Sequence, residues 1–145
     1  MPWIKVWLHF VWSTKNRLPY LEQSIRTKVF DHIRQNAREK AIHIDFINGY
    51  LEHVHCLISL GTDQTLDKLM QLIKGESSFW INRNKLTKTK FGWQDEYFVA
   101  SVSESNLAKV RRYIARQEEH HSKVPFAQEF DDLLLRSGFQ RFKDR

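Results

Sequence analysis

Alternating apolar and polar positions mark the first strands of the predicted fold. Residues 3–12 have apolar side chains at every even position, and residues 42–48 and 50–60 alternate over most of their length. This period of two is typical of β-strands with one buried face. Gly49 permits a tight connection, so the second and third strands are expected to form a hairpin. Residues 97–103 are the candidate for a fourth strand.

Helical periodicity occupies the intervals between these strands. Residues 21–40 carry apolar side chains at every fourth position, which predicts an amphipathic helix. A second helix is expected from the N-cap candidate Thr65 to about residue 80. A third runs over residues 104–121, and Pro125 opens a short terminal helix that ends near Gly138.

The order of these elements predicts the fold class. Strands and helices follow one another as β-α-β-β-α-β-α, with one further helix at the end. The expected fold is α+β: a ferredoxin-like or RRM-like split βαβ sheet, followed by a C-terminal helix that bears Tyr113. We expect a single domain over residues 1–145. Because such folds support many functions, the function has to be argued from the site.

Composition indicates the cellular compartment of the protein and the charge of its partner. The single cysteine, Cys56, excludes an intramolecular disulfide and favours a cytoplasmic location. Its place on the apolar row of a strand predicts that it is buried. No apolar run approaches the roughly 18–20 residues that span a bilayer, so no membrane partner is expected. The net charge of +6 favours a polyanionic partner.

The first strand has a second face that is too aromatic to be left in water. This face carries Trp3, Trp7 and Val11. Only the helix over residues 104–121 and the terminal helix remain to cover it within one chain. A two-fold dimer would bury such a surface on both subunits at once.

Two histidines on the third strand are the first candidates for chemistry. His53 and His55 are separated by one residue, so both leave the strand on the face opposite its apolar row. Their backbones are expected to lie roughly 6–7 Å apart, close enough for two imidazoles to bind one metal ion. A His-x-His pair alone is a weak signal.

The helix over residues 104–121 supplies a second group of candidates. Tyr113 and Gln117 are four residues apart and therefore share one helix face. Gln117 offers an amide oxygen to a hard divalent ion, and Tyr113 offers a hydroxyl nucleophile. A phenol with a pKa near 10 is largely protonated at pH 7, a deficit of about 4 kcal/mol. His120 and His121 are rival ligands one turn further on.

Cationic and aromatic residues mark a candidate surface for single-stranded nucleic acid. Phosphates attract positive charge and bases stack on flat rings. The candidates for such contacts are Lys15, Arg17, Lys74, Trp80, Arg83, Lys85, Lys88, Trp93 and Arg111.

Five ordered motifs together resemble a known family. They are HFVWSTKNR at residues 9–17, HVHCLISL at 53–60, KGESSFWIN at 74–82, FGWQ with SVSES at 91–105, and YIARQEEHH at 113–121. The chain resembles the single-tyrosine, His-hydrophobe-His (HUH) transposases of the insertion sequence 200-like family. Glu52 stands where that family often has an aspartate before the first histidine.

The resemblance implies a function and a site. Members cut single-stranded DNA beside small hairpins at the ends of a mobile element and rejoin it. By resemblance, His53, His55 and Gln117 would hold Mg²⁺ or Mn²⁺, and Tyr113 would attack the scissile phosphate and form a 5′-phosphotyrosine. The family also implies a homodimer in which each tyrosine acts in trans on the partner's histidines.

Two other functions are compatible with the same residues. One is a domesticated or inactive protein that binds single-stranded nucleic acid through an RRM-like sheet without catalysis. The aromatic-rich central motif of such sheets is absent, since His53, His55 and Leu57 occupy the relevant positions. The other is a zinc hydrolase, which would need His121 in place of Gln117 as the third ligand.

Overall fold

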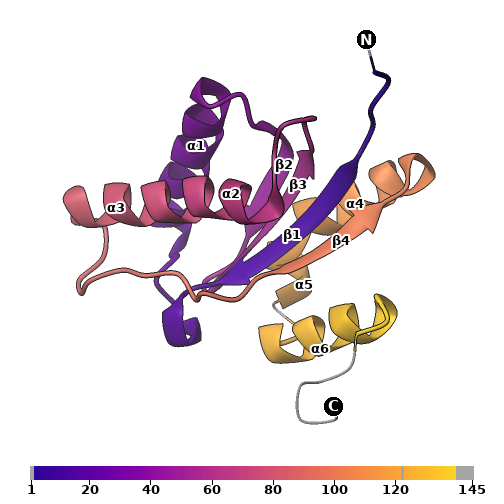
Figure 1. The fold of residues 1–145 in the computed structure, drawn as a ribbon. Coiled ribbons are helices and arrows are strands. Elements are labelled where there is room, and N and C mark those ends of the chain that lie inside the picture. Colours follow the sequence, from indigo (N-terminus) through magenta and orange to yellow (C-terminus); the bar gives the residue numbers. More distant parts are fainter. Residues whose placement is uncertain (1, 122, 140–145) are drawn as a thin grey trace.

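A four-stranded antiparallel sheet is the centre of the fold (Figure 1). The computed structural model describes residues 2–121 and 123–139. The strands are β1 (Trp7–Ser13), β2 (His43–Gly49), β3 (His53–Ser59) and β4 (Phe98–Val102). They lie in the order β2-β3-β1-β4, so β1 and β3 are the two central strands.

Two layers of helices cover the two faces of the sheet (Figure 1). One layer holds α1 (Gln23–Glu39), α2 (Leu66–Met70) and α3 (Glu76–Arg83). The other holds α4 (Leu107–Ala115), α5 (Gln117–His121) and α6 (Phe126–Arg136). The first layer packs on the apolar rows of β1 and β3, which include Phe10 and Cys56. This arrangement confirms the predicted α+β fold, and Cys56 is buried as expected.

The predicted hairpin joins β2 to β3 through a close backbone approach. An ideal Cβ placed on Gly49 would lie 2.1 Å from the carbonyl oxygen of His53. Any side chain at this position would therefore force the hairpin open. The turn is closed by the Tyr50 amide, which donates to the same carbonyl at 3.1 Å.

The first strand is shorter than its sequence pattern predicts. β1 begins at Trp7, whereas alternation predicted a strand from residue 3. β1 pairs with β3 and β4 from Trp7 onward. Trp3 is fully exposed, so alternation there does not mark a buried face.

Two predicted helices are interrupted. The helix expected over residues 65–80 contains a π-helical turn at Gln71–Gly75, between α2 and α3. Its N-cap is Thr65, as predicted. The helix expected over residues 104–121 is divided at Arg116, whose φ of −97° and ψ of 20° end α4 before α5 begins. The prediction of one continuous helix through Tyr113 and Gln117 is therefore wrong.

The second face of β1 is covered by helices of the same chain. Val11 is fully buried in a cluster with Phe98, Phe126 and Leu133, two of which come from α6. The Trp7 indole donates to Glu104 at 2.9 Å. Within the described residues, Val11 is thus covered by the same chain, whereas Trp7 is half-buried and Trp3 is fully exposed. No helix in the described part of the chain is both long and apolar enough to cross a bilayer.

Candidate active site

His53 and His55 lie on the sheet face that α4, α5 and α6 cover. Both imidazoles are fully buried, and their ring centroids lie 5.1 Å apart. β3 is a central strand, so the pair is placed in the middle of the sheet rather than at an edge. The strand alternation predicted this shared face. Their burial depends on the helices that fold over them.

Each histidine is held by a neighbour through Nδ1. His53 Nδ1 lies 2.8 Å from Glu52 Oε1, and His55 Nδ1 lies 2.8 Å from His9 Nε2. Partners of this kind fix the orientation of metal-binding imidazoles in many proteins. They leave the Nε2 atoms of both rings directed at the same space, which makes this the donor set of a candidate metal centre.

Gln117 meets His53 in an arrangement that requires positive charge. The carboxylate of Glu52 only accepts hydrogen bonds, so His53 donates through Nδ1, and a neutral ring then has a lone pair on Nε2. That atom lies 2.9 Å from Gln117 Oε1, which is also an acceptor. Two acceptors at this distance attract only when a proton or a cation lies between them. The geometry fits a metal ion held by His53 and Gln117.

Burial favours the neutral form of His55 and of its neighbour His9. Desolvation lowers the pKa of His55 to about 4, against the opposing effect of Glu129. It also lowers the pKa of His9 to about 3, with the neighbouring His55 adding to the effect. Neutral imidazole is the form that binds metal ions, so His55 is available as a ligand at neutral pH without losing a proton.

Tyr113 reaches the histidines from α4. Its ring centroid lies 5.5 Å from that of His55, and its hydroxyl donates a hydrogen bond to Glu129 Oε2. Burial, followed by the hydrogen bond to Glu129, raises the pKa of Tyr113 above its usual value. The phenol is thus held protonated, and its proton already points at a carboxylate.

Glu129 is the site residue that sequence analysis missed. It lies on α6, is only 2% exposed, and its Oε1 lies 3.1 Å from His55 Nε2 and 3.0 Å from His121 Nε2. The sequence of the terminal helix did contain a signal for this residue. Phe126 and Leu133 lie on the buried side of α6, and Glu129 occupies the i+3 position of the same stripe. A carboxylate on the apolar face of a helix points to a buried polar partner.

The rival ligands His120 and His121 lie against the same carboxylate, and the His121 ring also packs on His53 with centroids 4.5 Å apart. His120 Nε2 is buried without a hydrogen-bond partner in the described structure and lies 3.4 Å from Glu129 Oε2. His121 Nδ1 lies 2.6 Å from the carbonyl oxygen of Val124. The described residues contain two groups suited to a metal ion, His53 with His55 and Glu129, and His120 with His121 and Glu129.

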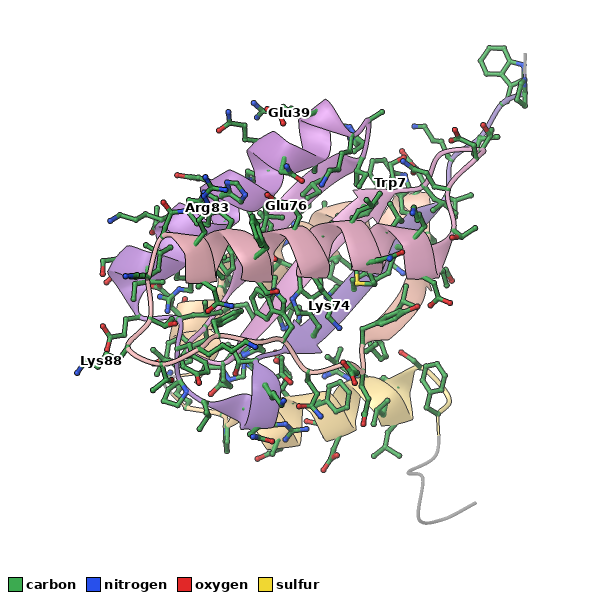
Figure 2. The ribbon with its side chains drawn as sticks, turned by 60° about the vertical axis from the view of Figure 1, so that its left-hand side comes forward. Trp7, Glu39, Lys74, Glu76, Arg83 and Lys88 are labelled. Atoms are coloured by element: carbon green, nitrogen blue, oxygen red, sulfur yellow. The ribbon has the colours of Figure 1, made fainter. Side chains whose placement is uncertain are left out.

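The predicted nucleic-acid contacts are spread over several surfaces. The exposed ones are Lys15, Arg17, Arg83, Lys85 and Lys88. Figure 2 shows Lys88 pointing into solvent from the loop that follows α3. Arg17 is in the region of α6, where its guanidinium lies 5.1 Å from the ring centroid of Phe126.

Two of the predicted cationic contacts have protein partners. Lys74 points toward the loop before β4 and donates to the carbonyl oxygens of Gln94 and Asp95 at 2.6 and 3.1 Å (Figure 2). Arg111 forms a two-pronged pair with Asp45, with distances of 2.7 and 2.9 Å. Both side chains are half-buried, and each connects its own helix to a neighbouring segment of the chain.

The two tryptophans differ in accessibility. Trp93 is 8% exposed, and its indole donates to Ser77 Oγ at 2.9 Å. It is a core residue and presents no free ring face to a base. Trp80 is half-buried and stacks on His32 with ring centroids 4.0 Å apart.

A cationic cavity beside Tyr113 was not predicted. It measures about 400 Å³ and is lined by Lys109, Arg112, Tyr113, Arg116, Glu119, His120, Lys123 and Val124. The lining residues come from α4, α5 and the segment that follows them. None of these basic residues was among the predicted nucleic-acid contacts. Lys109, Arg112, Tyr113 and Arg116 share one face of α4 and its C-terminal end, which places the basic groups beside the tyrosine.

Comparison with known proteins identifies relatives over most of the chain. The family model Y1_Tnp, described as transposase IS200 like, matches residues 3–117. The ISDra2 transposase TnpA of Deinococcus radiodurans is 24% identical over 116 residues, which make up 77% of this chain and 83% of that protein.

Two solved structures have the same fold. One is a Deinococcus radiodurans R1 protein described as a transposase, with 22% identity, a TM-score of 0.65, and coverage of 80% of this chain and 93% of that one. The other is a REP-associated tyrosine transposase bound to a REP hairpin, with 18% identity, a TM-score of 0.64, and coverage of 86% and 73%. The matched region of the family model includes β1 to β4 together with His53, His55, Tyr113 and Gln117. The chain therefore belongs to the IS200-like transposase family.

Proposed function

We propose that this transposase cuts and rejoins single-stranded DNA through Tyr113 with the help of a divalent metal ion. One observation supports the proposal above all others. Two strand histidines, an amide oxygen and a tyrosine from different elements converge on one buried point, with Gln117 Oε1 2.9 Å from His53 Nε2. Membership of a transposase family supports the proposal.

The residues present fit the ion that the family implies. His53, His55 and Gln117 would hold it, with Mg²⁺ or Mn²⁺ as the expected ions. The facing acceptors of His53 and Gln117 support this assignment, since a cation removes their repulsion. When bound, the ion polarises the scissile phosphate and offsets negative charge that develops on its oxygens.

Tyr113 is the proposed nucleophile. Its hydroxyl oxygen forms a bond to phosphorus while the bond from phosphorus to the 3′ oxygen breaks. The 3′ oxygen leaves with that electron pair and takes up a proton, which gives a free 3′-hydroxyl and a 5′-phosphotyrosine. Glu129 Oε2 accepts the hydrogen bond of the hydroxyl and orients it, and the tyrosine proton is released to water as the bond to phosphorus forms. Rejoining is the reverse step with another 3′-hydroxyl, so no nucleotide cofactor is consumed.

The cationic cavity beside Tyr113 is the proposed path of the scissile strand. Lys109, Arg112 and Arg116 line it, and a phosphate within it would lie next to the nucleophile. A solved relative by fold is bound to a REP hairpin, and we propose that this chain likewise recognises a DNA hairpin near its cleavage site.

The subunit that Tyr113 serves is a separate question. The family resemblance predicts a homodimer with the tyrosine acting in trans, and this stays a prediction. Within one chain, however, Tyr113 already lies against His55 and Glu129 of the same chain. This geometry favours action in cis.

Covalent capture of DNA tests the proposed function. Single-stranded DNA labelled on the 3′ side of the cleavage site should become attached to the protein in the presence of Mn²⁺ and remain free in excess EDTA. A binding protein without catalysis would retain DNA and form no adduct. A zinc hydrolase would release cut DNA without an adduct. The absence of any adduct across a panel of hairpin substrates, with DNA binding intact, would contradict the proposal.

A further inference from the structure

We infer that Glu129 is a metal ligand of the His53 and His55 centre, supplied by a helix that lies beyond the family-matched part of the chain. The inference rests on the proposed function and adds to it a carboxylate ligand. The family model ends at residue 117, whereas α6 begins at Phe126. The proposed centre would then contain two imidazole nitrogens, one amide oxygen and one carboxylate oxygen.

Distances around Glu129 Oε1 are those expected between neighbouring ligands of one ion. Bonds of about 2.0–2.1 Å separate adjacent ligand atoms by roughly 3.0 Å in an octahedral shell and about 3.3 Å in a tetrahedral one. Oε1 lies 3.1 Å from His55 Nε2 and 3.4 Å from His53 Nε2. All three side chains are buried, which limits their freedom to separate.

The charge of the site also favours a cation. Glu129 is 2% exposed, and a buried carboxylate is costly unless it is paired. Among the described residues, its ion-pair partners within 4.0 Å are His53, His55, His120 and His121, with no lysine or arginine. A divalent ion between Glu129 and the strand histidines would supply positive charge that does not depend on protonation of these imidazoles.

The carboxylate is placed to act on both sides of the centre. Oε1 faces the histidine nitrogens, while Oε2 accepts hydrogen bonds from the Tyr113 hydroxyl and from Gln117 Nε2, the latter at 3.3 Å. Binding of one oxygen to the ion would therefore hold the tyrosine hydroxyl at a set distance from it. His121, whose Nε2 lies 3.0 Å from Oε1 and whose ring packs on His53, holds the carboxylate as a positioning residue.

Metal binding without DNA tests the inference directly. Titration of the full-length protein with Mn²⁺, followed by calorimetry and by the electron paramagnetic resonance of free Mn²⁺, gives the dissociation constant. We expect Glu129→Gln, which preserves shape and removes charge, to weaken binding at least about tenfold, since even outer partners of a metal site contribute 10–100-fold. Asp132→Asn on the same helix is the matched control and should bind as the unmodified protein does.

Three further results complete the test. Glu129→Asp, which keeps the charge on a shorter side chain, should recover part of the affinity lost in Glu129→Gln. The double variant His53→Ala/His55→Ala should weaken Mn²⁺ binding more than Glu129→Gln does, since it removes both imidazole ligands of the proposed centre. If Glu129→Gln is folded by circular dichroism and binds Mn²⁺ within about threefold of the unmodified protein, Glu129 is not a ligand. The proposed function would survive that result provided that the unmodified protein still forms the DNA adduct.

Discussion

The hydroxyl of Tyr113 on α4 donates a hydrogen bond to the carboxylate of Glu129 on α6. This single contact links the proposed nucleophile to a residue outside the family-matched region. Through the same carboxylate, Tyr113 is connected to His55 on β3, whose Nε2 lies 3.1 Å from Glu129 Oε1. Tyr113, Glu129 and a strand histidine therefore form one hydrogen-bonded network.

Replacing Tyr113 by phenylalanine should abolish the covalent DNA adduct. The ring and its packing remain, while the attacking oxygen is removed. The loss of one hydrogen bond to a charged group should lower the free energy of unfolding by no more than about 3 kcal/mol. Gel analysis of labelled DNA and thermal unfolding measure the two effects. An adduct formed by folded Tyr113→Phe protein would show that another residue is the nucleophile.

Removal of single ligands should have graded effects on cleavage. His53→Ala or His55→Ala should reduce cleavage below detection, because a strong nitrogen ligand is lost from a buried position. Gln117→Ala should retain more activity, since water can replace an amide oxygen. Cleavage rates at saturating Mn²⁺ give the comparison. Excess EDTA should stop cleavage by every variant and by the unmodified protein. Activity that persists in chelator would exclude the metal from the reaction.

Mixing two inactive proteins distinguishes action in cis from action in trans. One carries Tyr113→Phe and the other carries His53→Ala/His55→Ala. From the contact between Tyr113 and its own chain, we expect the mixture to remain inactive. If the tyrosine acts in trans, each heterodimer has one intact site and up to about half of the normal adduct appears. Subunit exchange between tagged proteins has to be demonstrated first, unless both are monomers.

Salt dependence should locate the DNA. Arg112 and Arg116 line the cavity beside Tyr113, and so does Lys109. Changing all three to glutamine should reduce the slope of log affinity against log salt by about 2, at roughly 0.7 per phosphate contact with a single strand. The parallel triple change of Arg83, Lys85 and Lys88 tests the loop after α3. A slope that changes only in this second protein would move the DNA from the cavity to that loop.

The hydrophobic periodicity and the motifs of the sequence were enough to predict the fold class, the shared face of the two strand histidines and the family. Alternation placed His53 and His55 on one face of a strand, because successive side chains on a strand point to opposite sides. The order of strands and helices predicted an α+β fold with a hairpin at Gly49. Motif resemblance pointed to the family to which the chain belongs.

The tertiary structure decided what sequence periodicity does not encode. Helical spacing alone placed Tyr113 and Gln117 on one continuous helix, but the chain turns at Arg116. Trp93 is an aromatic residue of the kind that stacks on bases, yet its side chain is buried. Glu129 reaches the histidines only because α6 folds back over the sheet, far from β3 in sequence. Local propensity acts over a few residues, whereas a buried site is assembled by packing between elements that are distant along the chain.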